Sequence, residues 1–450
     1  MTVIAMNSKA GSAPQGMKTF LVIWIGQLIS LLGSGITSFA LGVWIFDQTG
    51  KATPFALTIL FGNLPRILLL PVAGSLADRW NRRRVMILSD VGNALVTISV
   101  FVLLLFGSLQ FWHIYLIVTL GSIFSAFQEP AYMASVTMLV PKKDLSRANG
   151  MMQMGQALEM IITPVIAGVL FVAIGLSGIL VIDFVTFLFA VGALLLVHIP
   201  QPNLTEHEEK KASVWEDAKF GWNYLKARPG LFGLLWYFAM VNFLLNWAGV
   251  LIGPMILSRF NAGTLGTIQM VVGIGMLAGG ILSSVWAGPR RKITAVIGYI
   301  GFALLGMIVA GLQPSPVFVG VGLFWLMIFV PLASASSQAV FQSKVAPELQ
   351  GRVFSIRGMI SRSVMPIAFL LAGPLADRMF NPLLEVNGAW ANTFLGTLLG
   401  TGAGRGIGLM FVISAITGIL VTLFVYANPR IRNIEDELPD AMPVASAQTA

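Results

Sequence analysis

The chain has 450 residues, of which 56% are hydrophobic and only 10% are charged. A water-soluble globular domain carries roughly 25% charged residues, so this composition excludes one. The net charge of +9 does not indicate a nucleic-acid partner, because basic loops beside anionic lipid account for it. The absence of cysteine excludes a disulfide framework and a thiolate metal site.

Apolar runs recur along most of the sequence, and each is long enough to cross a hydrocarbon layer roughly 30 Å thick. They predict an all-α polytopic membrane protein with twelve transmembrane helices in two six-helix halves. The spans predicted in the first half are 18–46, 53–76, 85–107, 110–140, 148–172 and 175–199. Those predicted in the second half are 230–258, 264–287, 293–312, 316–343, 352–376 and 404–427.

These spans divide the chain into five predicted parts. In order they are a cytoplasmic N-terminal tail, a six-helix half, a cytoplasmic linker, a second six-helix half and a cytoplasmic C-terminal tail: 1–17, 18–199, 200–229, 230–427 and 428–450. The linker is charged and contains Ser213 and Glu216 at the spacing of a capping box. An amphipathic helix follows, which we interpret as lying on the membrane surface or, alternatively, as a solvated linker helix.

The basic residues set the orientation of the predicted spans. Of the 28 Lys and Arg residues, about 22 fall on the side of the two termini, where the positive-inside rule predicts the cytoplasm. The external loops carry only four: Lys51, Arg259, Arg378 and Arg405. We therefore expect both termini in the cytoplasm.

The segment AGSLADRWNRRR at 73–84 lies between the second and third spans. It resembles the cytoplasmic signature of the major facilitator superfamily, G-x-L-a-D-R-x-G-R-R/K, and departs from it at Asn81, where the signature has glycine. The resemblance covers essentially the whole chain. It is greatest to the drug:proton antiporter branch, which includes macrolide efflux proteins and the enterobactin exporter.

The resemblance implies that this loop is a cytoplasmic latch, which forms when the cytoplasmic side is closed. We expect its members to be Gly74, Asp78, Arg79, Arg82, Arg83 and Asp90. Asp90 is included because it begins the third span close to the basic loop, where it can pair with arginine. The alternative is a basic anchor preceded by a helix-ending aspartate.

A near-copy of the phrase, AGPLADRMFN, stands at 372–381 on the predicted outer side. In a six-plus-six repeat the counterpart of the first phrase follows the eighth span, where the sequence is AGPRRK at 287–292. We therefore interpret the copy at 372–381 as a coincidence of small-residue packing and a helix end.

Carboxyl groups inside spans are costly, so each is a functional candidate. All four that the sequence predicts lie in the first half: Asp90, Glu129, Glu159 and Asp183. Proton-coupled export requires a carboxyl that alternates between protonated and ionised forms. We rank Glu159 and Glu129 first as proton carriers and Asp183 third. The alternative is a structural carboxyl hydrogen-bonded between helices.

Other polar residues mark a predicted substrate pathway, because the resemblance implies that spans 1, 4, 7 and 10 line the cavity. The candidates are Gln27, Ser34, Ser38, Arg66, Asn242, Asn246, Gln338 and Arg362. The two arginines act either as counter-ions of buried carboxylates or as contacts for an anionic substrate. As a counter-ion, Arg66 would pair with Glu129 or Glu159. For any single Ser or Asn the alternative is a hydrogen bond between helices.

No phosphate-binding glycine loop, metal-ligand cluster or nucleophile motif occurs in the sequence, so we expect neither an enzyme nor a cofactor or metal. The resemblance implies a monomeric secondary active efflux transporter in the plasma or bacterial inner membrane, with a role in antibiotic resistance. Its partners would be a hydrophobic, macrolide-like substrate, protons and membrane lipid. The alternatives are export of a siderophore or peptide natural product, an uncoupled facilitator, or a non-transporting receptor.

Overall fold

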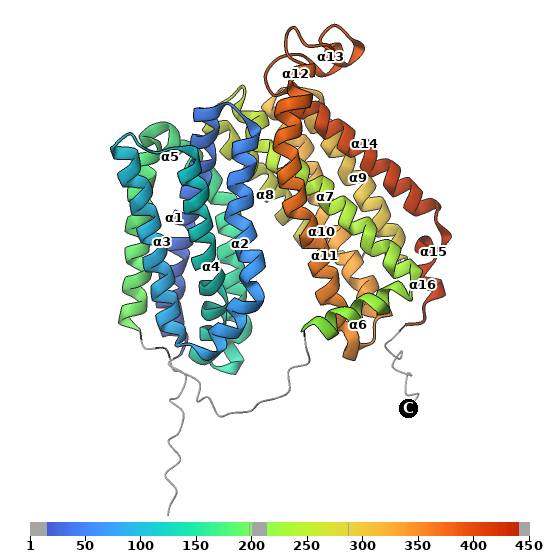
Figure 1. Ribbon diagram of the computed structural model, residues 1–450. Helices are drawn as coiled ribbons and strands as arrows, with labels where there is room; N and C mark the ends of the chain where they lie inside the picture. The colour runs from blue at the N-terminus through green and yellow to red at the C-terminus, as the bar shows by residue number, and fades with distance from the viewer. Residues whose placement is uncertain (1–15, 198, 200–213, 287, 441–450) are drawn as a thin grey trace, which may run out of the picture. The chain divides into compact units, whose positions relative to one another are not determined.

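The computed structural model describes residues 16–197, 199, 214–286 and 288–440 (Figure 1). Within two helices and at one helix start, some side chains also lie outside the described set: those of residues 70, 71, 74–79, 214–218, 347 and 348. The described residues form helices joined by short connections, without strands. The prediction of an all-helical membrane protein is thereby confirmed.

Eleven helices in the described ranges are long and apolar enough to cross a membrane. The first five are α1 (Met17–Thr49), α2 (Ala52–Arg79), α3 (Arg82–Leu105), α4 (Phe111–Leu139) and α5 (Leu145–Leu196). The other six are α7 (Pro229–Leu257), α8 (Ala262–Val285), α9 (Lys292–Leu312), α10 (Pro316–Lys344), α11 (Pro347–Leu375) and α14 (Arg405–Ala427).

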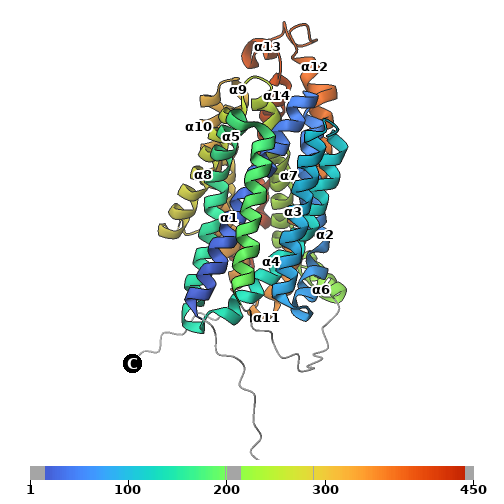
Figure 2. The ribbon, with the colours of Figure 1, turned by 90° about the vertical axis from the view of Figure 1, so that its left-hand side faces the viewer.

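The helix α5 accounts for two of the twelve predicted spans. It has 52 residues, and its helical backbone is interrupted at Gly175, where φ is 66°. At about 1.5 Å per residue, each of its two limbs is long enough to cross the hydrocarbon layer. Figure 2 shows the two limbs meeting at one end. Glycine suits this position because it adopts positive φ without a steric penalty.

Seven short helices connect or follow the long ones. They are η1 (Lys142–Asp144), α6 (Val214–Lys226), the π-helical η2 (Ala376–Phe380), α12 (Asn381–Leu383), α13 (Phe394–Leu399), α15 (Pro429–Arg432) and α16 (Ile434–Glu437). The predicted linker helix is α6, although Ser213 and the side chain of Glu216 lie outside the described residues. Leu225 is buried, and Trp222 meets Phe232 of α7 edge to face. The apolar face of α6 therefore packs against protein.

A local capping bond explains the asparagine that replaces glycine in the signature. The side chain of Asn81 accepts a hydrogen bond from the backbone N–H of Arg84 at 3.1 Å, so Asn81 is the N-cap of α3. This bond satisfies one of the N–H groups that a helix leaves without an intrahelical partner at its start. Asn81 therefore begins the third span as well as ending the turn after α2.

The chain divides into two compact units that do not coincide with the two predicted halves. The first unit comprises Met1–Ser38, Phe61–Glu159 and Ile174–Glu206. The second comprises Phe39–Leu60, Met160–Ala173 and His207–Ala450. The end of α1, the start of α2 and part of the first limb of α5 thus group with the second half of the sequence. The predicted domain boundaries stay a prediction.

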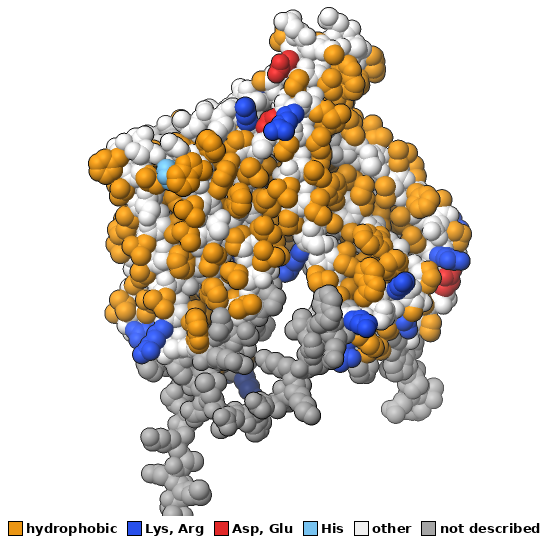
Figure 3. All heavy atoms as spheres, in the orientation of Figure 1, with side chains coloured by type: hydrophobic (Ala, Val, Ile, Leu, Met, Phe, Trp, Pro, Cys, Tyr) orange, Lys and Arg blue, Asp and Glu red, His pale blue; other side chains and the backbone are white. Residues whose placement is uncertain are grey.

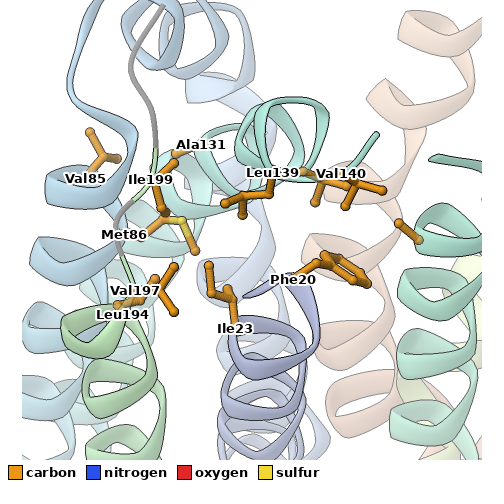
Figure 4. Packing of buried hydrophobic residues seen from close by; sticks show 12 residues of the cluster. Phe20, Ile23, Val85, Met86, Ala131, Leu139, Val140, Leu194, Val197 and Ile199 are labelled. Atoms are coloured by element: carbon orange, nitrogen blue, oxygen red, sulfur yellow. The ribbon is translucent and has the colours of Figure 1, made fainter. Parts of the chain in front are cut away.

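The first unit has a hydrophobic cluster where the starts of α1 and α3 meet the end of α4 and both ends of α5 (Figure 4). Its twelve buried members are Phe20, Ile23, Val85, Met86, Ala131, Val136, Leu139, Val140, Ala148, Leu194, Val197 and Ile199. Since lipid tails are as apolar as these side chains, close packing holds the cluster together rather than exclusion of water. It fixes the helix ends next to Asp90.

The second unit relies on glycines for close helix contacts. A Cβ atom at Gly275 of α8 would lie 2.8 Å from the carbonyl oxygen of Phe324 in α10. A Cβ at Gly168 of α5 would lie 2.6 Å from the carbonyl oxygen of Ala262 at the start of α8. Small residues let membrane helices approach in this way. Outside these contacts, hydrophobic side chains cover most of the visible helix surfaces (Figure 3).

Candidate functional site

Asp90 on α3 is the centre of a polar cluster in the first unit, and its residue surface is only 1% exposed. Gln27 on α1 donates from Nε2 to Asp90 Oδ2 at 3.1 Å. Gln128 on α4 donates to Asp90 Oδ1 and, at 3.0 Å, to the Gln27 side-chain oxygen. The structure thus gives Asp90 two glutamine partners where the sequence led us to expect arginine. Gln27, a pathway candidate, belongs to this cluster.

Asp183 on the second limb of α5 is equally buried, at 1% exposure. Thr97 of α3 donates to its Oδ2 at 3.1 Å, and Ser34 of α1 approaches its Oδ1 at 3.5 Å. The carboxyl therefore joins three helices through hydroxyl groups. Buried polar groups are hydrogen-bonded in this manner because an unsatisfied group is costly. Ser34 faces a carboxyl, whereas Ser38, one turn further along α1, is exposed.

Arg66 of α2 forms an ion pair with Glu129 of α4, as the sequence reasoning suggested. Its Nε donates to Glu129 Oε2 at 3.2 Å, and its Nη2 contacts the same oxygen. The two side chains are 47% and 36% exposed. Arg66 also interacts electrostatically with Glu159 of α5, which is partly buried. The recorded ion pair and hydrogen bonds of the Arg66 guanidinium are with Glu129.

The basic residues at the start of α3 hold helix ends together. Arg82 donates from Nη1 to the carbonyl oxygen of Ala134 at 2.9 Å. Arg83 donates from Nε to the carbonyl of Leu194 at 2.8 Å and from Nη2 to that of Leu195 at 2.9 Å. A cation near the C-terminus of a helix interacts favourably with the helix dipole. Three predicted latch members, Gly74, Asp78 and Arg79, have side chains outside the described residues.

A cavity of about 230 Å³ lies in the second unit among α7, α9, α10 and α11. Its lining is mainly apolar, with Asn242, Ser334, Arg357 and Ser361 as the polar members. Arg357 donates to the Gln338 side-chain oxygen at 2.8 Å and to Ser337 Oγ at 3.0 Å. Its guanidinium also lies 4.5 Å from the ring centre of Phe341. Within the described residues, its recorded partners are neutral.

The remaining pathway candidates lie apart from this cavity or bond locally. Asn246 donates its amide to the carbonyl of Asn242, and Asn242 donates to that of Phe238, both on α7. Arg362 is exposed on α11. Sequence reasoning missed Arg357, because we counted it with the cytoplasmic basic residues. The signal was available, since Arg357 follows the start of the predicted eleventh span by five residues.

Two buried cations lie near helix ends of the second unit. Arg405 at the start of α14 is 1% exposed and donates from Nη2 to the carbonyls of Gly311 and Leu312 at 2.9 Å. Its Nε bonds the carbonyl of Leu399 in α13. Lys344 at the end of α10 donates to the carbonyls of Glu435 and Leu438 at 2.7 and 2.6 Å, and it forms an ion pair with Asp440 at 2.8 Å. The described residues contain no group of three or more His, Asp or Glu side chains that could hold a metal.

Comparisons with known proteins give the family. The family model described as Major Facilitator Superfamily matches residues 23–369. Macrolide efflux protein A of Streptococcus pyogenes is 29% identical over 365 residues, which cover 80% of this chain and 90% of that protein. The multidrug efflux pump Tap of Mycolicibacterium fortuitum is 24% identical over 369 residues, covering 79% and 89% respectively.

Solved structures support the same fold. A bacterial homologue of the human lysosomal transporter Spinster, in its inward-facing and unoccupied conformation, matches with a TM-score of 0.68 at 16% identity. The match covers 95% of this chain and 99% of that one. The nucleoside transporter NupG matches with a TM-score of 0.62 at 13% identity, covering 91% and 99%. At these identities the likeness concerns the fold alone.

Proposed function

The chain belongs to the Major Facilitator Superfamily, and on this premise we propose that it is a proton-coupled exporter of a hydrophobic, macrolide-like small molecule. Its family and its efflux relatives are transporters rather than enzymes. The macrolide class is suggested by the relatives named for macrolide efflux. In bacteria such export would confer antibiotic resistance.

The observation that carries proton coupling is the group formed by Arg66, Glu129 and Glu159. Arg66 forms an ion pair with Glu129 there, and Glu159 is a second carboxyl within electrostatic range of Arg66, so the three side chains carry a net charge of −1 when both carboxyls are ionised. A net charge inside a low-dielectric membrane is costly, and one bound proton removes it. Proton uptake would therefore make this group neutral, and proton release would return it to a net charge of −1.

The half-exposed state of the pair supports the same assignment. A proton carrier must exchange protons with water, and the side chains of Arg66 and Glu129 are 47% and 36% exposed. Asp183 and Asp90 are enclosed by neutral donors. We therefore keep Glu159 and Glu129 as the first proton-carrier candidates and Asp183 as the third.

The cavity beside Arg357 supports a partly apolar substrate. Ligand sites combine an apolar lining with a few polar groups that orient the ligand, and this lining has that composition. A volume of about 230 Å³ accommodates part of a macrolide rather than the whole molecule. We propose that a carbonyl or another acceptor group of the substrate binds near Arg357 and Asn242.

The distribution of basic residues supports an orientation with both termini in the cytoplasm. We propose that the protein acts as a monomer in the bilayer of the cell membrane, with substrate and protons moving in opposite directions. The lipid partners are the anionic headgroups beside the basic loop that contains Arg82, Arg83 and Arg84.

The test is proton movement in inside-out vesicles with a fluorescent probe of the pH gradient, while macrolides, dyes and catecholate siderophores are added in turn. We expect macrolides to dissipate the gradient in wild type, and Glu159→Gln to reduce the effect by about tenfold or more, because the glutamine amide cannot carry a proton. Glu385→Gln is the matched control, because Glu385 is exposed in a connecting loop.

The outcomes separate the alternatives. A response to siderophores but not to macrolides would give a siderophore exporter. Substrate flux without proton movement would give an uncoupled facilitator. Binding without flux would give a receptor. An equal response in wild type and Glu159→Gln would reject Glu159 as the proton carrier.

A further inference from the structure

Arg357 of α11 is a cation inside the second unit, and the long helices around it supply almost no negative charge. Between residues 229 and 375 the sequence has a single acidic residue, Glu348 in the first turn of α11, and the span 405–427 has none. Glu348 precedes Arg357 by nine residues, about 14 Å along a helix at 1.5 Å per residue. A cation within the hydrocarbon layer is costly when it has no counter-charge.

Neutral neighbours on α10 fix the position of the Arg357 guanidinium. It donates to the Gln338 side-chain oxygen at 2.8 Å and to Ser337 Oγ at 3.0 Å, and it lies 4.5 Å from the ring centre of Phe341. Ser337 and Phe341 are fully buried, so they hold the side chain in a defined place. A guanidinium group has five N–H donors, and the recorded hydrogen bonds use two of them. Donors therefore remain for an acceptor that enters the cavity.

The cavity beside Arg357 has room for such an acceptor and for a short apolar chain. Its volume is about 230 Å³, and it lies among α7, α9, α10 and α11, all of which belong to the second unit. Apolar side chains form most of the lining, among them Leu245, Leu304 and Val330. Ser361, one helical turn after Arg357, and Asn242 of α7 line it as well and bring a hydroxyl and an amide.

We propose that this cavity binds an oxyanion on a short apolar chain, a carboxylate or a phosphate, with Arg357 as its counter-charge. The planar guanidinium can donate two parallel hydrogen bonds to the oxygens of either group, and the apolar lining receives the chain. This site rests on the proposed function in one respect, because the cavity is the one assigned there to an acceptor group of the substrate. That group is here an anion.

The charge of the ligand decides its binding more than its length does. A neutral acceptor leaves the guanidinium without a counter-charge, and an amine adds a second positive charge beside it. An oxyanion neutralises the site, and hydrogen bonds between two ionised groups are the strong ones. The cavity volume of about 230 Å³ lies below the range of about 300–1,000 Å³ that is typical of ligand pockets. The bound molecule, or the bound part of it, is therefore small.

Octanoate is a suitable probe, because it combines a carboxylate with a short apolar chain. Binding of radiolabelled octanoate to the purified full chain is measured by scintillation proximity in nanodiscs of phosphatidylcholine, and the signal of empty nanodiscs is subtracted. Unlabelled octyl phosphate, octanamide and octylamine compete in turn. We expect octyl phosphate to bind within about threefold of octanoate, and octanamide and octylamine to bind about tenfold more weakly or worse, since neither carries a negative charge.

Two variants separate the effect of charge from that of space. Arg357→Gln removes the charge and should weaken octanoate binding by about tenfold or more, while octanamide binding stays within about twofold. Ala303→Leu enlarges a buried side chain of the lining and should weaken octanoate and octanamide by the same factor. Arg352→Gln is the matched control, because it removes an exposed positive charge from the same helix, and it should leave both affinities unchanged.

The lipid of the nanodisc shows where the anion comes from. Competition with octanoate by added phosphatidic acid would assign the site to the phosphate of a lipid headgroup. Octanoate binding that is undiminished by this lipid would assign it to a free anionic ligand. Either result agrees with an oxyanion site at Arg357.

Absence of octanoate binding, equal affinities for octanoate and octanamide, or unchanged octanoate binding in Arg357→Gln would overturn the proposal. Size-exclusion chromatography verifies that each variant is folded. The measurement involves neither drug efflux nor proton flux. A failed efflux assay beside intact octanoate binding would therefore reject the proposed function alone, and macrolide efflux without octanoate binding would reject the anion site alone.

Discussion

The two compact units treat their buried ionisable groups in different ways. In the first unit, Asp90 and Asp183 are held by side chains from neighbouring helices. In the second unit, Arg405 and Lys344 are held by backbone carbonyls at the ends of helices and in the segments that follow them, and Lys344 also forms an ion pair with Asp440. A guanidinium group stays protonated in proteins, whereas a carboxyl can gain or lose a proton. The buried cations of the second unit thus hold helix ends together, whereas the first unit has buried carboxyl groups that can titrate.

Arg405→Leu tests the structural role of a buried cation in the second unit, and it should give the largest effect on the free energy of unfolding. Three hydrogen bonds to carbonyls would be lost inside a buried site, and unsatisfied buried acceptors cost about 1–3 kcal/mol each. We expect the free energy of unfolding to fall by about 3 kcal/mol or more. Thermal unfolding in detergent, monitored by the fluorescence of the 11 tryptophans, measures it. Arg378→Gln is the control, because Arg378 is exposed, and an equal loss there would refute the structural role of Arg405.

Asp183→Asn compares two carboxyl groups of the first unit, those of Asp183 and Glu159, as proton carriers. The amide keeps an oxygen that can accept from Thr97, so the fold should persist, and we expect proton-coupled efflux to stay within about twofold of wild type. Glu159→Gln, measured in the same vesicles, should lose most of it. The reverse order of effects would move the proton from the Arg66 group to Asp183.

The smallest expected effects concern the hydroxyl groups around Asp183. Thr97→Val removes a donor at 3.1 Å and should lower the free energy of unfolding by about 1 kcal/mol. Ser34→Ala removes a donor at 3.5 Å, at the limit of a hydrogen bond, and should cost less than about 0.5 kcal/mol. Paired thermal unfolding curves compare the two, and a larger loss for Ser34→Ala would contradict the geometry.

The sequence predicted the long helices well because a membrane demands apolar runs of a fixed minimum length. It also gave Glu129 or Glu159 as the partner of Arg66, since a cation and a carboxyl inside neighbouring spans have few other ways to be accommodated, and the structure pairs Arg66 with Glu129. The glutamine partners of Asp90 were missed. Gln128 is adjacent to Glu129 in sequence, and successive residues of a helix point in different directions, so the two serve separate clusters.

Contacts between distant segments were the least predictable. Nothing local to Lys344 or Arg405 indicates burial. The recorded partners of Arg405 are backbone carbonyls, which every residue possesses, and the one carboxylate that pairs with Lys344, that of Asp440, is about a hundred residues away in sequence. The contact in which Asp377 accepts hydrogen bonds from the backbone N–H groups of Ala52 and Thr53 did leave a signal in the sequence, the repeated phrase. We interpreted the phrase at 372–381 as a coincidence because the six-plus-six repeat places its counterpart after the eighth span. The repeat compares positions in the sequence and does not indicate which helix start Asp377 contacts.

The break in α5 at Gly175 also bears on how the protein is made. The helix has 52 residues, about 78 Å if continuous at 1.5 Å per residue, against a hydrocarbon layer about 30 Å thick. A single glycine reverses the chain, and no polar loop separates the two limbs. During synthesis, therefore, no hydrophilic segment between the two limbs can delay the insertion of the second limb after that of the first. We expect the fifth and sixth spans to enter the bilayer together, as one helical hairpin.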